Sequence, residues 1–163
     1  MARKVFFSFH YQRDIWRVSQ VRNCNVITST YQKNDFLDAV SWEQVIRQGE
    51  QAIKNWIDNQ LKGTSVTIVL IGNQTSQRKY VHYEIEQSYK KGNGLVGIYI
   101  HTIKNKDGQT DFIGANPLAT WHIKDGNNIR FFTDIFKTYY WDWDNGRSNI
   151  GLWIEETAKI VGR

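Results

Sequence analysis

The chain has 163 residues, of which 40% are apolar and 14% aromatic, so it can bury a core and is too apolar to be disordered. Its net charge of +5 favours anionic ligands only weakly, and no basic run is long enough for a nucleic-acid-binding arm. The lone cysteine, Cys24, cannot form an internal disulfide, which favours a reducing compartment. The apolar run that follows Met1 is too short for a signal peptide or a membrane span, so we expect a cytoplasmic protein with no membrane partner.

The first third of the chain predicts strands and helices in alternation. Residues 5–9 are typical of a short buried strand, and residues 15–21 of a helix. Residues 26–30 are rich in β-branched side chains and indicate a second strand or an extended segment. A loop is expected over residues 32–41. Apolar residues then recur at helical spacing over residues 42–61, which predicts one helix.

The centre of the chain predicts a strand, a turn and a helix. Residues 66–72 are almost all apolar and β-branched, which is typical of a strand buried on both faces of a parallel sheet. The polar residues 73–76 offer N-cap side chains for a helix over residues 77–91, which lysines and Gly92 close. Four residues share its apolar face: Val81, Ile85, Ser88 and Tyr89. Glu84 lies at the edge of that face, where a carboxylate can face a cleft and contributes little to stability.

The last part of the chain continues this alternation. Residues 95–101 predict another buried strand, and residues 104–114 a polar loop with a turn at Asp107-Gly108. Short strands are predicted at residues 131–132 and 139–143, before a terminal helix over residues 149–161. This order predicts a flavodoxin-like α/β fold with three layers and a mainly parallel central sheet. Ligands of such sheets bind beyond the carboxyl ends of the strands.

Three further motifs in the sequence have simpler interpretations than a ligand site. Residues 92–97 match GxGxxG by letter, but they lie between a helix and the following strand, the reverse of a dinucleotide fingerprint. His10 and His101 both end strands and could bind a metal together, but no third ligand is evident, so we expect no metal site. They are more simply interpreted as polar residues at a cleft mouth. The cluster over residues 141–143 is more typical of packing or of an interface.

The order of four segments points to a family: residues 5–11, 38–43, 63–72 and 80–85. Together they resemble the TIR-like domains of bacterial Thoeris anti-phage defence, of the ThsB type. The resemblance covers residues 3–102 and fades in the aromatic-rich remainder. We therefore expect one TIR-like domain over residues 1–163, with residues 103–163 as a divergent C-terminal part.

The resemblance implies a function in defence signalling. Members of this kind are hydrolases that cleave NAD at the nicotinamide–ribose bond and release a cyclic ADP-ribose isomer, which activates a separate effector protein. NAD is then the substrate, and no prosthetic group is implied. The family's catalytic glutamate lies on the helix after the third strand, which matches Glu84. A phage-derived trigger and self-association are compatible with this function. The alternative is a TIR-like interaction module with no turnover.

The resemblance also suggests how the substrate is held. Three aromatic residues offer flat surfaces for stacking a base: Phe9, Tyr11 and Trp42. For Phe9 and Trp42, packing in the core is an equally good interpretation. Ser8 and His10 lie at the exit of the first strand, where they could line the nicotinamide pocket. We expect the side chains of Glu84, His10 and Trp42 to face one pocket at the carboxyl ends of the strands.

Overall fold

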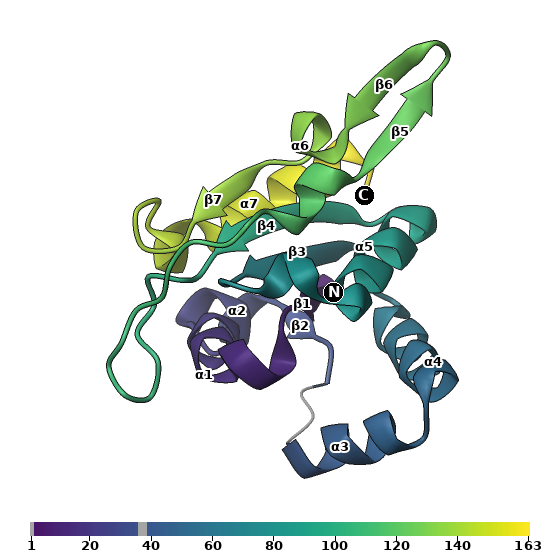
Figure 1. Ribbon diagram of the computed structural model, residues 1–163. Helices are drawn as coiled ribbons and strands as arrows, with labels where there is room; N and C mark the ends of the chain where they lie inside the picture. The colour runs from purple at the N-terminus through teal and green to yellow at the C-terminus, as the bar shows by residue number, and fades with distance from the viewer. Residues whose placement is uncertain (1, 36–38) are drawn as a thin grey trace.

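The centre of the protein is a parallel sheet (Figure 1). The computed structural model describes residues 2–35 and 39–163, and residues 36–38 of the predicted loop lie outside the described residues. The sheet has the strand order β2-β1-β3-β4-β7, and each neighbouring pair is parallel. Its strands are β1 (Lys4–Ser8), β2 (Gln32–Lys33), β3 (Val66–Ile71), β4 (Gly94–Tyr99) and β7 (Thr138–Tyr140). The predicted flavodoxin-like and TIR-like α/β class is confirmed.

β3 occupies the middle of the sheet, as its apolar sequence predicted. All six of its residues are buried, because helices cover both faces. Ile68 and Leu70 belong to the core cluster on one face, and Val69 and Ile71 to the cluster on the other. A slip of one residue would exchange these two sets, so burial on both faces specifies the register of β3 against its neighbours.

Helices lie on both faces of the sheet (Figure 1). One face carries α1 (Tyr11–Arg22), α2 (Asn25–Thr30) and α7 (Gly146–Ile160). The other carries α4 (Glu50–Leu61), α5 (Lys79–Lys91) and α6 (Phe132–Ile135), with α3 (Ala39–Arg47) beside α4 and the short helices η1 (Thr75–Gln77) and η2 (Pro117–Thr120). Within the described ranges, none of these helices has the length and apolar character needed to cross a membrane.

The terminal helix α7 is held on β4 by close contact. The Thr157 hydroxyl donates to the carbonyl oxygen of Leu95 at 2.6 Å. Gly94 lies so near the backbone of Thr157 that a Cβ at Gly94 would be 2.5 Å from the Thr157 carbonyl oxygen. The rings of Trp153 and Tyr139 stack at 4.1 Å between centroids. The buried residues of α7 include Ile150, Trp153, Ile154, Thr157 and Ala158, whereas Val161, just after the helix, is half-buried.

The prediction of a strand or extended segment over residues 26–30 is wrong, because these residues form α2. Ile27 is fully buried in the core, and Val26 lies close to Gly151 of α7. Packing against α7 thus outweighs the strand preference of the β-branched residues. The second strand is instead β2, which is only two residues long and lies within the segment predicted as a loop.

The single helix predicted over residues 42–61 is also wrong, because the structure has two helices, α3 and α4, divided at Gly49. Gly49 has φ +98° and ψ 177°, a conformation that residues with a side chain rarely adopt. Gln48 and Gly49 are the only residues between the two helices. Apolar periodicity therefore continues across the break, and spacing alone could not reveal it.

Replacing Gly49 with alanine is expected to lower the free energy of unfolding by about 1–3 kcal/mol, because alanine would have to adopt the same positive φ. Apart from the chain neighbours, no atom of the described residues lies within 4 Å of the position that the new Cβ would take, so the cost is conformational. Chemical denaturation measures the effect, with the exposed neighbour Gln48→Ala as the control. Equal stability of Gly49→Ala and the wild type would contradict the expectation.

The aromatic-rich C-terminal part contains a hairpin that the sequence did not predict. β5 (His122–Asp125) and β6 (Asn128–Phe131) pair in antiparallel fashion and project away from the sheet (Figure 1). Phe131 ends β6 but Phe132 begins α6, so the strand predicted at these two residues is half correct. β7 contains Tyr139 and Tyr140, and residues 141–143 follow it in turns rather than in the predicted strand.

Candidate active site

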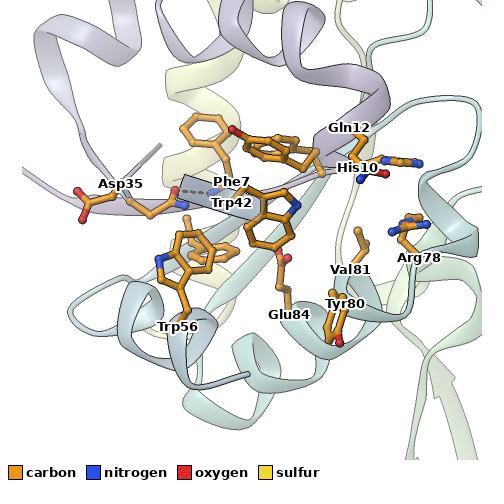
Figure 2. Close-up of a pocket in the computed structure, with 14 residues that line it drawn as sticks. Phe7, His10, Gln12, Asp35, Trp42, Trp56, Arg78, Tyr80, Val81 and Glu84 are labelled. Carbon is orange, nitrogen blue, oxygen red and sulfur yellow. Dashed lines mark hydrogen bonds between the residues drawn. The ribbon is translucent and has the colours of Figure 1, made fainter. Parts of the chain in front are cut away.

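A pocket opens at the carboxyl end of β1, beside the start of α5 (Figure 2). It encloses about 620 Å³ of space when the open, solvent-filled mouth is included. The wall comes from β1 and the segment after it, from two residues after β2, from α3 and α4, and from the start and first turns of α5. Glu84, His10 and Trp42 all line it, so the structure brings these three together as expected. Their functional roles stay predictions.

Glu84 lies on the second turn of α5, with its carboxyl directed toward the Trp42 ring (Figure 2). The side chain is only 9% exposed, and this burial raises the pKa of Glu84 from its usual 4.5 to about 8. No lysine or arginine of the described chain forms an ion pair with it. The sequence placed Glu84 at the edge of a helix face, but the structure buries the carboxyl, and its neutral form is favoured in the empty pocket.

Ser8 ends β1 and lies next to Glu84, behind the open pocket rather than on its wall. Its hydroxyl interacts with the Glu84 carboxyl and lowers the pKa, which offsets part of the effect of burial. Ser8 is fully buried, and its Oγ forms no hydrogen bond of normal geometry with the described residues. Because a hydroxyl can both donate and accept, Ser8 can serve either protonation state of Glu84.

Aromatic rings form one wall of the pocket. Phe9 and Tyr11 stack with 5.9 Å between ring centroids, and Tyr11 lies 5.2 Å from Trp42. Trp42 in turn meets Trp56 edge-on at 5.6 Å. All four side chains are half-buried, so the wall is both packed and accessible. Such a row of rings can stack a planar base, a contact worth about 1–3 kcal/mol for one base.

His10 lines the pocket on the side of Glu84 that lies away from Trp56 (Figure 2). It is 7% exposed, and its imidazole interacts with its own backbone but with no other hydrogen-bonding group of the described residues. Burial lowers the pKa of His10 below 6.5, and the positive charges of Arg78 and Arg13 lower it further. The imidazole is therefore neutral at pH 7 and can donate one N–H.

Arg78 and Trp56 line the pocket but were not predicted as site residues. The helix predicted from residue 77 with a serine or threonine cap begins two residues later, and its cap residue is Arg78, which makes no side-chain cap bond. The Thr75 hydroxyl instead accepts from the Gly72 N–H at 2.8 Å. Arg78 could have been identified as a site residue from its basic side chain and its position in the turn after the central strand. Trp56 was not predicted as a site residue, because its helical spacing places it on the apolar face of the helix and so predicts packing.

The other motifs considered from the sequence do not join the pocket. His101 lies among the rings of Tyr140 and Trp143, and no group of three or more His, Cys, Asp or Glu residues in the described part of the chain could hold a metal. Gly92 ends α5 with φ +87° and leads directly to β4, so the GxGxxG match is a helix-to-strand turn. Trp141 is buried, in agreement with the packing interpretation.

Comparison with known proteins identifies the family to which the chain belongs. The sequence model of the family described as "Thoeris protein ThsB, TIR-like domain" matches residues 6–105. The chain belongs to the ThsB TIR-like family. In this ThsB TIR-like chain, the matched segment contains the whole pocket wall, from Phe6 to Glu84.

A relative from Bacillus cereus (strain MSX-D12) extends the similarity. This protein, named "Putative cyclic ADP-D-ribose synthase ThsB1", is 38% identical over 148 residues. The aligned part covers 90% of this chain and 74% of the relative. The similarity of the ThsB TIR-like chain to this relative therefore continues beyond the segment that the family model matches.

Proposed function

We propose that this ThsB TIR-like protein cleaves NAD at the nicotinamide–ribose bond and releases a cyclised ADP-ribose. The observation that carries the proposal is the Glu84 carboxyl, buried in a pocket with a wall of stacked aromatic rings. The relative's name, a cyclic ADP-D-ribose synthase, supports the same reaction. NAD is a substrate in this proposal, and the reaction requires no prosthetic group.

The chemistry suits a buried carboxylate. When the bond between ribose C1′ and the nicotinamide nitrogen breaks, the electron pair stays on nicotinamide, which leaves as a neutral base. The ribose becomes oxocarbenium-like, and an ionised Glu84 stabilises that charge where water is excluded. The cationic substrate favours the ionised carboxyl, so binding lowers the pKa of Glu84 from about 8. In ring closure, a nucleophile of the ADP-ribose bonds to C1′ and its proton passes to Glu84.

The aromatic wall favours ring closure over hydrolysis. Stacking of the adenine on Trp42 and Tyr11 would fold the dinucleotide so that its far end lies near the reacting ribose. An acceptor held in this way has a very high effective concentration compared with a free one. The same rings shield the ribose from water, which would otherwise give linear ADP-ribose.

We further propose that the cyclic product acts as a diffusible signal that activates a separate effector protein after a phage-derived cue. The Thoeris name of the family supports a role in this defence system. The proposed location is the cytoplasm, where NAD is available. The buried, unpaired thiol of Cys24 is compatible with that reducing compartment.

The direct test is to incubate the purified protein with NAD, alone and in lysate of phage-infected cells, and to measure products by mass spectrometry. We expect nicotinamide and a cyclised ADP-ribose in equal amounts. Nicotinamide together with linear ADP-ribose alone would contradict cyclisation but not cleavage. No nicotinamide under either condition would contradict the enzyme and favour the interaction module.

The pH dependence of turnover is expected to follow Glu84. Because the free enzyme holds Glu84 at a pKa of about 8, kcat/KM for NAD should be about tenfold lower at pH 7 than on its plateau above pH 9. The pKa seen in the pH profile of kcat should be lower than the one seen in kcat/KM, because the bound cationic substrate favours the ionised carboxyl. The pKa of His10 is lowered from 6.5 by burial, so His10 titrates on the acid side of the rise expected from Glu84. A kcat/KM that is flat from pH 6 to 9.5, or that falls as pH rises, would contradict an ionised Glu84.

A further inference from the structure

A basic corner lies at one side of the pocket and has no assigned role in the reaction above. Figure 2 shows His10 and Arg78 together on the side of Glu84 away from Trp56 and Asp35. Both residues line the pocket, and the Arg78 charge is close enough to lower the pKa of His10. His10 is more than nine-tenths buried, yet its ring meets no hydrogen-bonding partner except its own backbone among the described residues. A buried polar group of this kind requires a partner.

Arg78 is left unpaired by a fold that pairs its basic neighbours. Arg13 donates to Asp111 at 2.8 Å, and Arg17 donates to the carbonyl of Ile103 at 2.7 Å. Lys79, the next residue in the chain, reaches Glu50 at 3.7 Å on a different surface. By contrast, the Arg78 guanidinium makes no ion pair or side-chain hydrogen bond with the residues that the structure describes. Its charge is therefore available to a ligand.

The start of α5 contributes to the same corner. Arg78 is the cap residue of this 13-residue helix, and no side chain caps its first turn. The first N–H groups of a helix have no partner within it, and they carry the positive end of the helix dipole. Tyr80 and Val81 of this first turn also line the pocket. Three kinds of donor thus converge: a free guanidinium, a buried neutral imidazole and helix N–H groups.

We propose that Arg78 and His10 form a subsite for the diphosphate of the dinucleotide, next to Glu84. The inference rests on the proposed function for the identity of this ligand. A guanidinium binds two phosphate oxygens at once with paired hydrogen bonds, and the neutral imidazole adds one donor when its single N–H turns from its own backbone to the ligand. The diphosphate then lies in the basic corner, the reacting ribose at Glu84 and the adenine on the aromatic wall. Arg78 sets the affinity for substrates that carry a diphosphate, and Glu84 sets the rate.

The test measures binding without turnover. Isothermal titration of the purified protein with ADP, adenosine and inorganic pyrophosphate separates the diphosphate from the base. We expect Arg78→Gln to weaken ADP and pyrophosphate binding by tenfold to a hundredfold and to leave adenosine binding unchanged. Arg78→Lys keeps a point charge but loses the paired geometry, so its affinity for ADP should be intermediate. Lys79→Gln removes the same charge from the adjacent position and should change ADP affinity less than twofold.

Turnover then distinguishes this inference from the proposed function. With NAD as substrate, Arg78→Gln should raise KM by a similar factor and change kcat little, whereas cleavage of nicotinamide riboside, which lacks the diphosphate, should be unaffected. Wild-type affinity for ADP in Arg78→Gln, or an equal loss in Lys79→Gln, would overturn the subsite even if NAD is cleaved. Loss of ADP binding in Arg78→Gln but not in Lys79→Gln would support the subsite even if the wild type cleaved no NAD.

Discussion

Replacing Glu84 with glutamine is expected to lower the kcat for NAD cleavage by about a hundredfold while changing KM little. Glutamine keeps the size and the hydrogen-bonding reach of glutamate but removes its negative charge. Loss of one charge-stabilising group in a shielded site costs about 3 kcal/mol in the transition state, which gives this factor. The aromatic wall and the basic corner remain, so binding of the substrate is retained. The measurement is the rate of nicotinamide release under conditions in which the wild type is active.

Glu86→Gln is the matched control for this experiment. Glu86 lies two residues further along α5, where helix geometry turns it away from the pocket, and it pairs with Lys90 at 2.8 Å. We expect this variant to keep its activity within about twofold. Equal activity of the wild type and Glu84→Gln would refute the catalytic role of Glu84. Equal losses in both variants would point instead to a general effect of charge on the helix.

The second large effect expected from Glu84→Gln is a gain of stability that appears only at alkaline pH. Between its unfolded pKa of 4.5 and its folded pKa of about 8, Glu84 holds a proton in the folded state but not in the unfolded state. Stability therefore falls as pH rises through this range, and the full cost is present above pH 8. At about 1.4 kcal/mol for each pKa unit, the cost approaches roughly 5 kcal/mol. Glutamine does not ionise, so the variant does not have this free-energy cost.

Chemical denaturation at pH 5 and pH 9 tests this linkage. The difference in free energy of unfolding between Glu84→Gln and the wild type should be small at pH 5 and roughly 3–5 kcal/mol in favour of the variant at pH 9. Glu86→Gln, at a half-buried position on the same helix, should show no such change with pH. A constant difference between variant and wild type at the two pH values would contradict a strongly raised pKa. A positive result would mean that the protein accepts a stability cost at Glu84 for its chemistry.

The sequence predicted the sheet well because the signals of its central strands are local. Val66–Ile71 is apolar at every position, and only a strand buried on both faces accommodates such a run. The failures occurred where distant contacts decide the structure. Residues 26–30 have strand propensity, yet they form a helix because α7, more than a hundred residues later, covers them. The break at Gly49 depends on a backbone angle, and a regular apolar spacing on either side hides it.

The sequence predicted that three residues share the pocket, but not the burial of Glu84 or the position of Arg78. Glu84, His10 and Trp42 share a pocket because a parallel sheet gathers its carboxyl ends at one edge. The burial of the Glu84 carboxyl could not be foreseen, because it depends on Ser8 behind it and on aromatic rings from other elements. Arg78 was missed for a related reason: a surface arginine becomes informative only when the fold shows that its basic neighbours are paired and that it has no partner among the described residues.

The position of α7 has a consequence for the order in which the protein can be completed during synthesis. The residues of the pocket wall run from Phe6 to Glu84, but α7, which shares one face of the sheet with α1 and α2, follows them in the chain. At a ribosomal rate of about 5–20 residues per second, Val96 and Ile98 of β4 wait several seconds for their contacts with α7. The nascent chain thus carries its whole pocket wall before α7 can cover its part of the core.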